Sequence, residues 1–437
     1  MLVVARARWA GVDAALRGLL VSDGLTILAQ MVGYVAIPWW IAQQGGARDL
    51  ASYGVVVAVA TFLSFPLLAP LGERLAKRTQ LLAGTAALAA AAGLFAVLAG
   101  TGRYELGLMI AAGLVSVVAN TFVAAASASI TPELVPAAAL PDALRLRKTA
   151  ASIGRLLGPA LGGGVLAGAG TASALWLHFA LLAAAALAAR RIPMALHHTQ
   201  PAGGGGLARW WFDLRAGLVA KWAVPLERGW TFVNFAVWIF VGPAFTLFVP
   251  LKVQALGLSG AWLGACEAGL SAGMLLGSLG ASDRLVQRFG RYRVRVGAAA
   301  AEGLLLAFVG WTQTPLLLVL GFVGAGFANT AMSLVGATHR ALAIPQEFRV
   351  RINAVNMMST QVAGAIGPAL AGIALLHWQL NSVYTAFGLV AAVLACGFIG
   401  VPRSREFFGL DHEQVKDWYR LQYPAGFATS DPPRAGS

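Results

Sequence analysis

The chain has 437 residues, of which 58% are hydrophobic by a broad count and only 11% are charged. Ordinary soluble domains carry about 25% charged residues, and a soluble fold of this size cannot hide so many apolar side chains from water. The composition also excludes a collagen-like chain, a disordered chain and a disulfide scaffold. The sequence therefore predicts an all-α protein that crosses a membrane many times.

The expected spans are long apolar runs, which are typical of helices and not of the short alternating strands of a membrane β-barrel. A helix needs about 20 apolar residues to cross the hydrocarbon core. The first run directly follows an arginine-bearing N-terminus, which favours a retained helix over a cleaved signal peptide. Twelve spans are expected, at residues 18–43, 51–71, 81–100, 105–128, 149–168, 171–189, 229–251, 258–280, 294–312, 315–337, 354–377 and 383–401.

The basic residues gather on one side of this map. The chain has 32 Lys and Arg against 18 Asp and Glu, a net charge of +14. All of these cations fall in the termini and inner loops except Arg48, Arg103 and Lys252 in outer loops, Arg155 inside a span and Arg295 at the second residue of another span. Short cytoplasmic loops carry an excess of Lys and Arg. We therefore expect both termini in the cytoplasm, and the positive charge does not indicate a nucleic-acid partner.

An internal repeat divides the chain into two halves. The Ala-Asn-Thr at 119–121 recurs 209 residues later at 328–330, and the Gly-Pro-Ala-Leu at 158–161 recurs at the same offset at 367–370. Such a register over half the chain predicts two parallel repeats of six helices. The expected domains are an N-terminal six-helix bundle at 1–189, a cytoplasmic linker loop at 190–228, a C-terminal six-helix bundle at 229–401 and a cytoplasmic tail at 402–437.

Two such halves form the architecture of one class of secondary transporters. Between spans eight and nine the chain reads Gly-Ala-Ser-Asp-Arg-Leu at 280–285, followed by Gly-Arg at 290–291. This loop resembles the G-x-L-A-D-R-x-G-R-R loop of the major facilitator superfamily. A copy in the first half departs from that pattern at Ala69, Glu73 and Ala76. The resemblance covers residues 15–401 and implies a transporter that works by alternating access.

The same resemblance implies a gating role for these loops. An acid at the cytoplasmic end of a helix pairs with nearby basic residues in one conformation and loses them in the other, and each exposed pair is worth a few tenths to about 1 kcal/mol. The alternative is a basic loop whose role is only topological. The gating residues expected here are Glu73, Arg74, Asp283 and Arg284.

A glycine-proline segment in span five, Gly158-Pro159, has a copy at Gly367-Pro368. Small residues let helices approach closely, and a proline removes one helical hydrogen bond. In the superfamily, a similar segment is associated with exporters, where it shapes the outer gate. Together with the Pro-Glu-Leu-Val-Pro at 132–136, it resembles the branch that includes enterobactin exporters and macrolide efflux pumps. The alternative is tight packing without directional meaning.

Ionisable residues inside predicted spans are expensive, about 2.5–3.5 kcal/mol each at a helix centre, and therefore point to function. Asp23 and Glu267 are expected to bind and release the transported proton. Arg155 is expected to neutralise one of them or to attract an anionic substrate; the alternative is a side chain that snorkels to the interface. Glu302 lies in span nine, which packs outside the cavity in this fold, and is expected to be structural.

A polar stripe on span one predicts part of the substrate cavity. Thr26, Gln30 and Tyr34 follow Asp23 at intervals that place them on one helical face. Asn120 and Asn329 lie at matching positions of the repeat, where they either line the cavity or join helices by hydrogen bonds. The expected cavity residues are Thr26, Gln30, Tyr34, Phe235, Trp238, Ser271, Asn120 and Asn329.

Motifs for other chemistry are absent from the sequence. No Walker lysine follows a glycine loop, and His197-His198 and Asp411-His412-Glu413 lack metal-site spacing. We expect no enzyme activity, no cofactor and no metal. The prediction is a monomeric transporter of the bacterial inner membrane that exports a small amphipathic compound, siderophore or drug-like, in exchange for protons. An uptake permease of the same fold is the alternative, and an intramembrane enzyme is a distant third.

Overall fold

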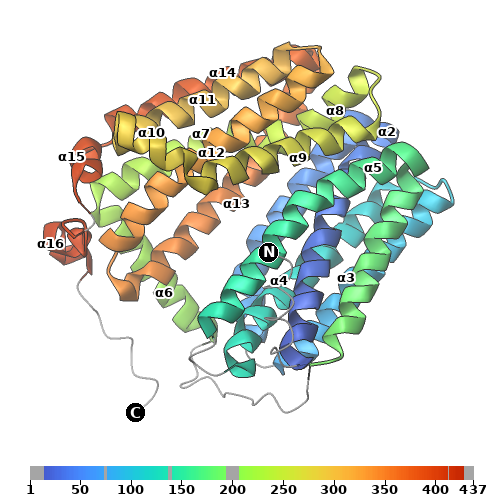
Figure 1. The fold of residues 1–437 in the computed structure, drawn as a ribbon, viewed down its shortest axis with the longest axis horizontal. Helices are drawn as coiled ribbons and strands as arrows, with labels where there is room; N and C mark the ends of the chain where they lie inside the picture. Colours follow the sequence, from blue (N-terminus) through green and yellow to red (C-terminus); the bar gives the residue numbers. More distant parts are fainter. Residues whose placement is uncertain (1–13, 73–75, 136–139, 193–205, 412, 428–437) are drawn as a thin grey trace. The chain divides into compact units, whose positions relative to one another are not determined.

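The computed structural model describes residues 14–72, 76–135, 140–192, 206–411 and 413–427, and all regular structure in these ranges is helical (Figure 1). Contacts between residues divide the chain into two compact units. The first unit contains Met1–Gly46, Leu63–Ala202 and Ser259–Ala265. The second contains Ala47–Phe62, Gly203–Leu258 and Cys266–Ser437. The division into two six-helix domains at 189 and 229 stays a prediction.

The first unit is built mainly from the first four described helices, although Ala47–Phe62 of the first of them belongs to the second unit, and its core consists of small aliphatic side chains. Gly84 of α3 lies so close to α4 that a methyl group there would meet the Val123 side chain at 2.6 Å and the Ala119 carbonyl at 3.1 Å. Leu81, Leu88 and other residues spaced by three, four or seven fill the same seam. The helices are α2 (Ala14–Gly72), α3 (Lys77–Gly100), α4 (Leu106–Leu134) and α5 (Leu140–Ala189).

Two of these helices are long enough to cross a membrane twice. α2 has 59 residues and α5 has 50, and each contains one break, at Gly46 (φ 66°) and Gly170 (φ 82°). A left-handed backbone conformation suits glycine and is costly for other residues. Among the described residues, ten helices are long and apolar enough to cross a membrane. The protein is therefore an all-helical, multi-pass chain, while the count of twelve spans stays a prediction.

The second unit holds most of the remaining helices, and one close seam of its core lies between α11 and α14. Methyl groups on Gly303 and Gly388 would meet backbone atoms of the facing helix at 2.4 Å and 2.2 Å. Phe248, Phe387 and Tyr384 pack beside this seam. Its helices are α6 (Gly206–Ala223), α7 (Pro225–Thr246), α8 (Phe248–Ala255), α9 (Gly260–Leu276), η2 (Gly277–Ala281), α10 (Ser282–Phe289), α11 (Arg291–Trp311), α12 (Pro315–Ala343), α13 (Gln346–His377), α14 (Leu380–Ala395) and η3 (Cys396–Gly400).

The C-terminal tail is folded onto the second unit. It forms α15 (Ser404–Gly409), α16 (Trp418–Gln422) and the short turn η4 (Pro424–Phe427). Phe407 and Phe408 pack against Trp230 of α7 and His339 of α12. The backbone amide of Asp417 donates to the Leu342 carbonyl at 3.0 Å. The tail is therefore part of this unit up to Phe427.

Candidate functional site

Asp23 lies inside the first unit and is held by a cation. Its side chain is 11% exposed, and Arg147 Nε donates to its Oδ2 at 2.7 Å. The Ser127 hydroxyl donates to the other carboxylate oxygen. The carboxylate thus joins α2 to α4 and α5.

Arg147 also donates hydrogen bonds to residues of α4. Its Nη1 donates to the Ser127 carbonyl at 3.1 Å and to the Thr131 hydroxyl at 2.9 Å. The sequence map placed Arg147 among the cations of an inner loop, so its role was missed. Arg155, the expected partner of Asp23 or Glu267, lies at an exposed position of α5, and its role stays a prediction.

Two buried hydroxyls flank Asp23 on α2. Ser22 and Thr26 are 1% and 5% exposed, and neither hydroxyl has a hydrogen-bond partner among the described residues. Buried hydroxyl groups without partners are uncommon, because leaving them unpaired costs free energy. The helix that carries Asp23 therefore has unused hydrogen-bonding capacity within one turn of it in the sequence.

The polar stripe of α2 faces α4. Gln30 Nε2 donates to Asn120 Oδ1 at 2.6 Å, in an exposed contact. Asp23 and Gln30 are seven residues apart, and so are their partners Asn120 and Ser127. Seven residues are about two helical turns, so the two contacts form successive polar rungs between the helices. A role for these residues in a substrate cavity stays a prediction.

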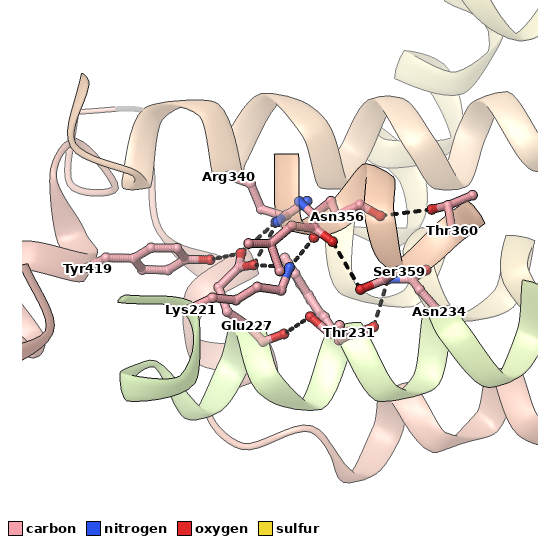
Figure 2. A network of polar contacts seen from close by, with 11 residues as sticks. Lys221, Glu227, Thr231, Asn234, Arg340, Asn356, Ser359, Thr360 and Tyr419 are labelled. Carbon is pink, nitrogen blue, oxygen red and sulfur yellow. Dashed lines mark hydrogen bonds and ion pairs between the residues drawn. The ribbon is translucent and has the colours of Figure 1, made fainter. Parts of the chain in front are cut away.

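The second unit contains a larger buried network around Glu227 (Figure 2). The Glu227 side chain is 0% exposed, and Arg340 donates to both of its oxygens, at 2.5 and 2.6 Å. The Tyr419 hydroxyl donates to Oε1 at 2.6 Å. Lys221 Nζ lies 3.5 Å from Oε2 and also contacts Asn356 Oδ1. A buried carboxylate is tolerated when it is paired and hydrogen-bonded in this way.

This network joins segments that are far apart in sequence: α6, α7, α12, α13 and α16 (Figure 2). Burial lowers the pKa of Lys221 to about 8 and raises the pKa of Tyr419 well above its usual value. The network was not predicted from the sequence, because Glu227 falls in the expected linker loop and Tyr419 falls in the expected tail. A buried aromatic hydroxyl in a tail gives no periodic signal.

The acids predicted in spans eight and nine have different surroundings. Glu302 is 1% exposed and accepts a hydrogen bond from Asn329 Nδ2 at 2.8 Å, which favours the helix-joining role for that asparagine. Glu267 is 5% exposed, and within the described ranges no ion pair holds it. Phe235 and Trp238 are half-buried on α7.

Both glycine-proline segments lie where two helices approach closely. A methyl group on Gly158 of α5 would meet the Met31 side chain of α2 at 2.3 Å. A methyl group on Gly367 of α13 would meet the Ile239 carbonyl of α7 at 2.5 Å. Pro159 and Pro368 follow directly, inside their helices. The geometry shows tight packing, and a role in a directional gate stays a prediction.

The expected gating loops are only partly within the described residues. Glu73 and Arg74 lie outside them. Asp283 and Arg284 are exposed in the first turn of α10, just after Gly280, whose φ is 95°. Asp283 forms no ion pair with any described residue. Nor do His, Cys, Asp and Glu side chains in the described ranges gather in groups of three or more that suit a metal ion.

Comparison with known proteins identifies the family. The family model for the Major Facilitator Superfamily matches residues 19–300 and 281–417. An uncharacterized MFS-type transporter of Yersinia pestis is 28% identical over 176 residues, which span 38% of this chain and 43% of that protein. The alignment thus covers less than half the length of that relative.

Solved structures share the fold. The nucleoside transporter NupG matches with a TM-score of 0.69 at 15% identity, over 89% of this chain and 99% of that one. A POT family transporter in complex with 5-aminolevulinic acid matches with a TM-score of 0.66 at 12% identity, over 90% and 96%. The human organic anion transporter MFSD10 matches with a TM-score of 0.55 at 17% identity, over 88% and 99%. Because the family model covers most of the chain, this multi-pass membrane protein belongs to the Major Facilitator Superfamily.

Proposed function

We propose that the protein is a proton-coupled exporter of a small amphipathic compound, siderophore or drug-like, in the bacterial inner membrane. In this proposal twelve spans form two parallel halves, both termini are cytoplasmic, and a monomer works by alternating access. Membership of a transporter superfamily favours transport over an intramembrane enzyme. The observation that carries the proton coupling is the Asp23–Arg147 pair inside the first unit.

The pair links a proton to helix packing. While Asp23 is ionised, it holds Arg147 across α2 and α5, and Arg147 holds Ser127 and Thr131 of α4. A proton on Asp23 removes the charge that attracts Arg147 and weakens both sets of contacts. The hydroxyls of Ser22 and Thr26, on the same helix as Asp23, are buried without hydrogen-bond partners among the described residues. In this proposal, proton binding weakens the contacts that join α2, α4 and α5. Coupling of proton movement to transport requires such a link between protonation and helix packing.

Glu267 is the rival coupling residue. It is buried without an ion pair among the described residues, and an ionised carboxylate in such surroundings is costly. A proton on Glu267 removes that cost without breaking another contact. Asp23 remains our leading candidate because its protonation also changes how helices are held together.

The proposed substrate residues include polar side chains of α2 in the first unit and aromatic side chains of α7 in the second unit. Gln30 and Asn120 present an exposed polar contact, and Trp238 and Phe235 supply apolar area for an amphipathic ligand. Thr26, Tyr34, Ser271 and Asn329 complete the proposed set. The resemblance of the glycine-proline segments to those of exporters supports export; the alternative is proton-coupled uptake by the same fold.

The test uses inverted membrane vesicles acidified inside, with ethidium, a macrolide and a catecholate siderophore as probes. An exporter accumulates at least one probe, and Asp23→Asn abolishes this uphill transport while downhill exchange survives. Glu267→Gln is the matched variant, and the two are compared for which one flattens the pH dependence. Uphill transport by Asp23→Asn with unchanged pH dependence would transfer the coupling role to Glu267. Accumulation only in right-side-out vesicles would show uptake.

A further inference from the structure

The two units each carry a groove of nearly the same size on their helical surface. One groove, the α3–α4 groove, has a volume of about 460 Å³ and is lined by residues including Ala83, Ala87 and Val118. The other, the α11–α12 groove, has a volume of about 440 Å³ and is lined by residues including Arg293 and Gly297. Both volumes fall in the range of small-molecule pockets.

The internal repeat relates the two grooves. Val118 of α4 lines one groove, and Phe327 of α12, which is 209 residues later in the sequence, lines the other. Neighbouring lining residues of these two helices are related by the same offset. On α3 and α11 three pairs of lining residues correspond at 210 residues, Ala83 with Arg293, Gly84 with Val294 and Ala87 with Gly297. The same offset relates the Glu-Arg at 73–74 to the Asp-Arg at 283–284. The grooves therefore occupy equivalent places in the two repeats and are a feature of the fold.

The linings are those of a surface that contacts hydrocarbon. Apart from Thr79 and Gln80 in one groove and Arg293 in the other, the described linings are apolar or glycine. Several stay exposed, including Val115 and Phe289, each at 46%. Exposed apolar side chains in a membrane-spanning helix are covered by lipid chains.

The repeat places an arginine in only one groove. Arg293 corresponds to Ala83 at the 210-residue offset, and both positions are exposed. Arg293 forms no ion pair or hydrogen bond with a described residue. It belongs to a basic segment, residues 284–295, that contains five arginines and no acid. Basic pockets between spans on the cytoplasmic side suit anionic lipid head groups.

We propose that the α11–α12 groove is a binding site for one anionic phospholipid of the cytoplasmic leaflet. One acyl chain lies in the apolar groove over Gly297, and the phosphate of the head group pairs with Arg293. The α3–α4 groove takes an acyl chain in the same way but does not select the head group, because it has Ala83 at the equivalent place. This inference goes beyond the proposed function and does not depend on the direction of transport.

The test is native mass spectrometry of the full chain in detergent, with phosphatidylglycerol and phosphatidylethanolamine of identical chains added in equal amounts. A basic side chain near the membrane surface contributes about 1 kcal/mol toward anionic lipid, so we expect about a fivefold preference for phosphatidylglycerol at one site. Arg293→Gln should abolish the preference, and Arg293→Lys should keep most of it. Arg228→Gln, exposed at the start of α7, is the matched control and should change nothing.

Two further variants separate the chain site from the head-group site. A side chain added at Gly297 meets no atom within 4 Å, so Gly297→Leu fills the groove without a clash and should lower retention of both lipids. Ala83→Arg should give the α3–α4 groove the same preference for phosphatidylglycerol. The number of phosphatidylglycerol molecules that each protein retains selectively should then rise from one to two. Equal retention of both lipids by the wild type, or an equal loss in Arg228→Gln and Arg293→Gln, would overturn the proposal.

Discussion

Asn356 lies 209 residues after Arg147, at the equivalent position of the second repeat, and the two side chains have opposite roles in their networks. Arg147 donates to Asp23, whereas Asn356 accepts from Lys221. The same offset relates Thr131 to Arg340, so the arginine has changed helices between the repeats.

The two repeats nevertheless share one arrangement. In each repeat, a carboxylate on the first helix pairs with an arginine from another helix of the same unit. The burial differs, since Glu227 is 0% exposed and Asp23 is 11% exposed. Three side chains contact the Glu227 carboxylate, including Tyr419 of the tail. We interpret the Glu227 network as a fixed part of the second unit and the Asp23 network as the more changeable of the two.

Substitutions of Asp23 and Arg147 are expected to have strongly non-additive effects on the free energy of unfolding. Removing one partner of a largely buried pair leaves a charge uncompensated, so Arg147→Gln should lower the free energy of unfolding by up to about 3 kcal/mol. The double variant Asp23→Asn, Arg147→Gln should recover most of that loss, because no charge then remains unpaired. Thermal unfolding in detergent measures both.

Arg155→Gln is the control for this cycle, since it removes an exposed arginine from the same helix. It should change the free energy of unfolding by no more than about 0.5 kcal/mol. Additive effects of the two single substitutions at Asp23 and Arg147 would show that the pair contributes no coupling energy.

The periodic features of this fold were predictable from the sequence. The repeat gave the correspondence between Asn120 and Asn329, and helical spacing placed Gln30 on the face of Asp23. The family and the multi-pass helical character also followed from apolar runs and loop motifs. These features depend on local spacing, which a sequence displays directly.

The partners of the buried acids were not predictable in the same way. Arg147 is one of many cations near predicted inner loops, and charge counting treats them as equivalent. Glu227 and Tyr419 are 192 residues apart, and no periodicity relates a helix start to a tail. Asn120 and Asn329 share a repeat position but contact different helices, since Asn120 meets α2 and Asn329 meets α11. Which face a polar residue uses depends on its non-local neighbours.

The tail should contribute stability through one hydroxyl group. Tyr419→Phe removes a hydrogen bond to the buried Glu227 carboxylate, and hydrogen bonds to charged groups contribute about 1.5–3 kcal/mol. Tyr423→Phe is the matched control, because its hydroxyl only accepts a bond from Arg403 at 3.3 Å. Thermal unfolding should show a clear loss for the first and little change for the second. Equal stability of both variants would show that the tail hydroxyl is dispensable.

Lys221 should make stability depend on pH. Burial lowers its pKa to about 8 from 10.5, so between pH 8 and 10 the unfolded chain binds more protons than the folded chain. The free energy of unfolding should therefore rise with pH through this window, and below it this lysine should contribute no pH dependence because it is protonated in both states. Tyr419 stays protonated there, because burial raises its pKa above 10.0.

Chemical or thermal unfolding at pH 7.5 to 10 covers about the range in which Lys221 changes its protonation state. Over this range the free energy of unfolding of Lys221→Met should rise less with pH than that of the wild type. Lys416→Met, which changes an exposed lysine of the tail, should keep the full rise. Identical pH profiles for wild type and Lys221→Met would contradict the assignment.

Asp283 should affect turnover more than affinity. It is exposed and forms no ion pair with a described residue in this conformation, so a gating role requires it to pair in another. Asp283→Asn should slow transport of a probe while leaving expression and probe affinity largely intact. Glu73→Gln should have a smaller effect, because the loop around it departs from the superfamily pattern. Wild-type transport by both variants would leave these loops with a topological role only.

The orientation of the chain can be tested with single cysteines and a membrane-impermeant maleimide, after Cys266 and Cys396 are replaced by alanine. Thr101 is exposed in the turn between α3 and α4, and it suits a cysteine better than Gly102, whose φ is 67°. Thr101→Cys should react in intact cells, because its loop is predicted to be outside. Arg215→Cys, exposed on α6 in the linker, should react only after lysis, because basic residues retain that side in the cytoplasm. Labelling of Arg215→Cys in intact cells would overturn both the twelve-span map and the parallel repeats, since an odd number of spans would then separate the linker from the N-terminus.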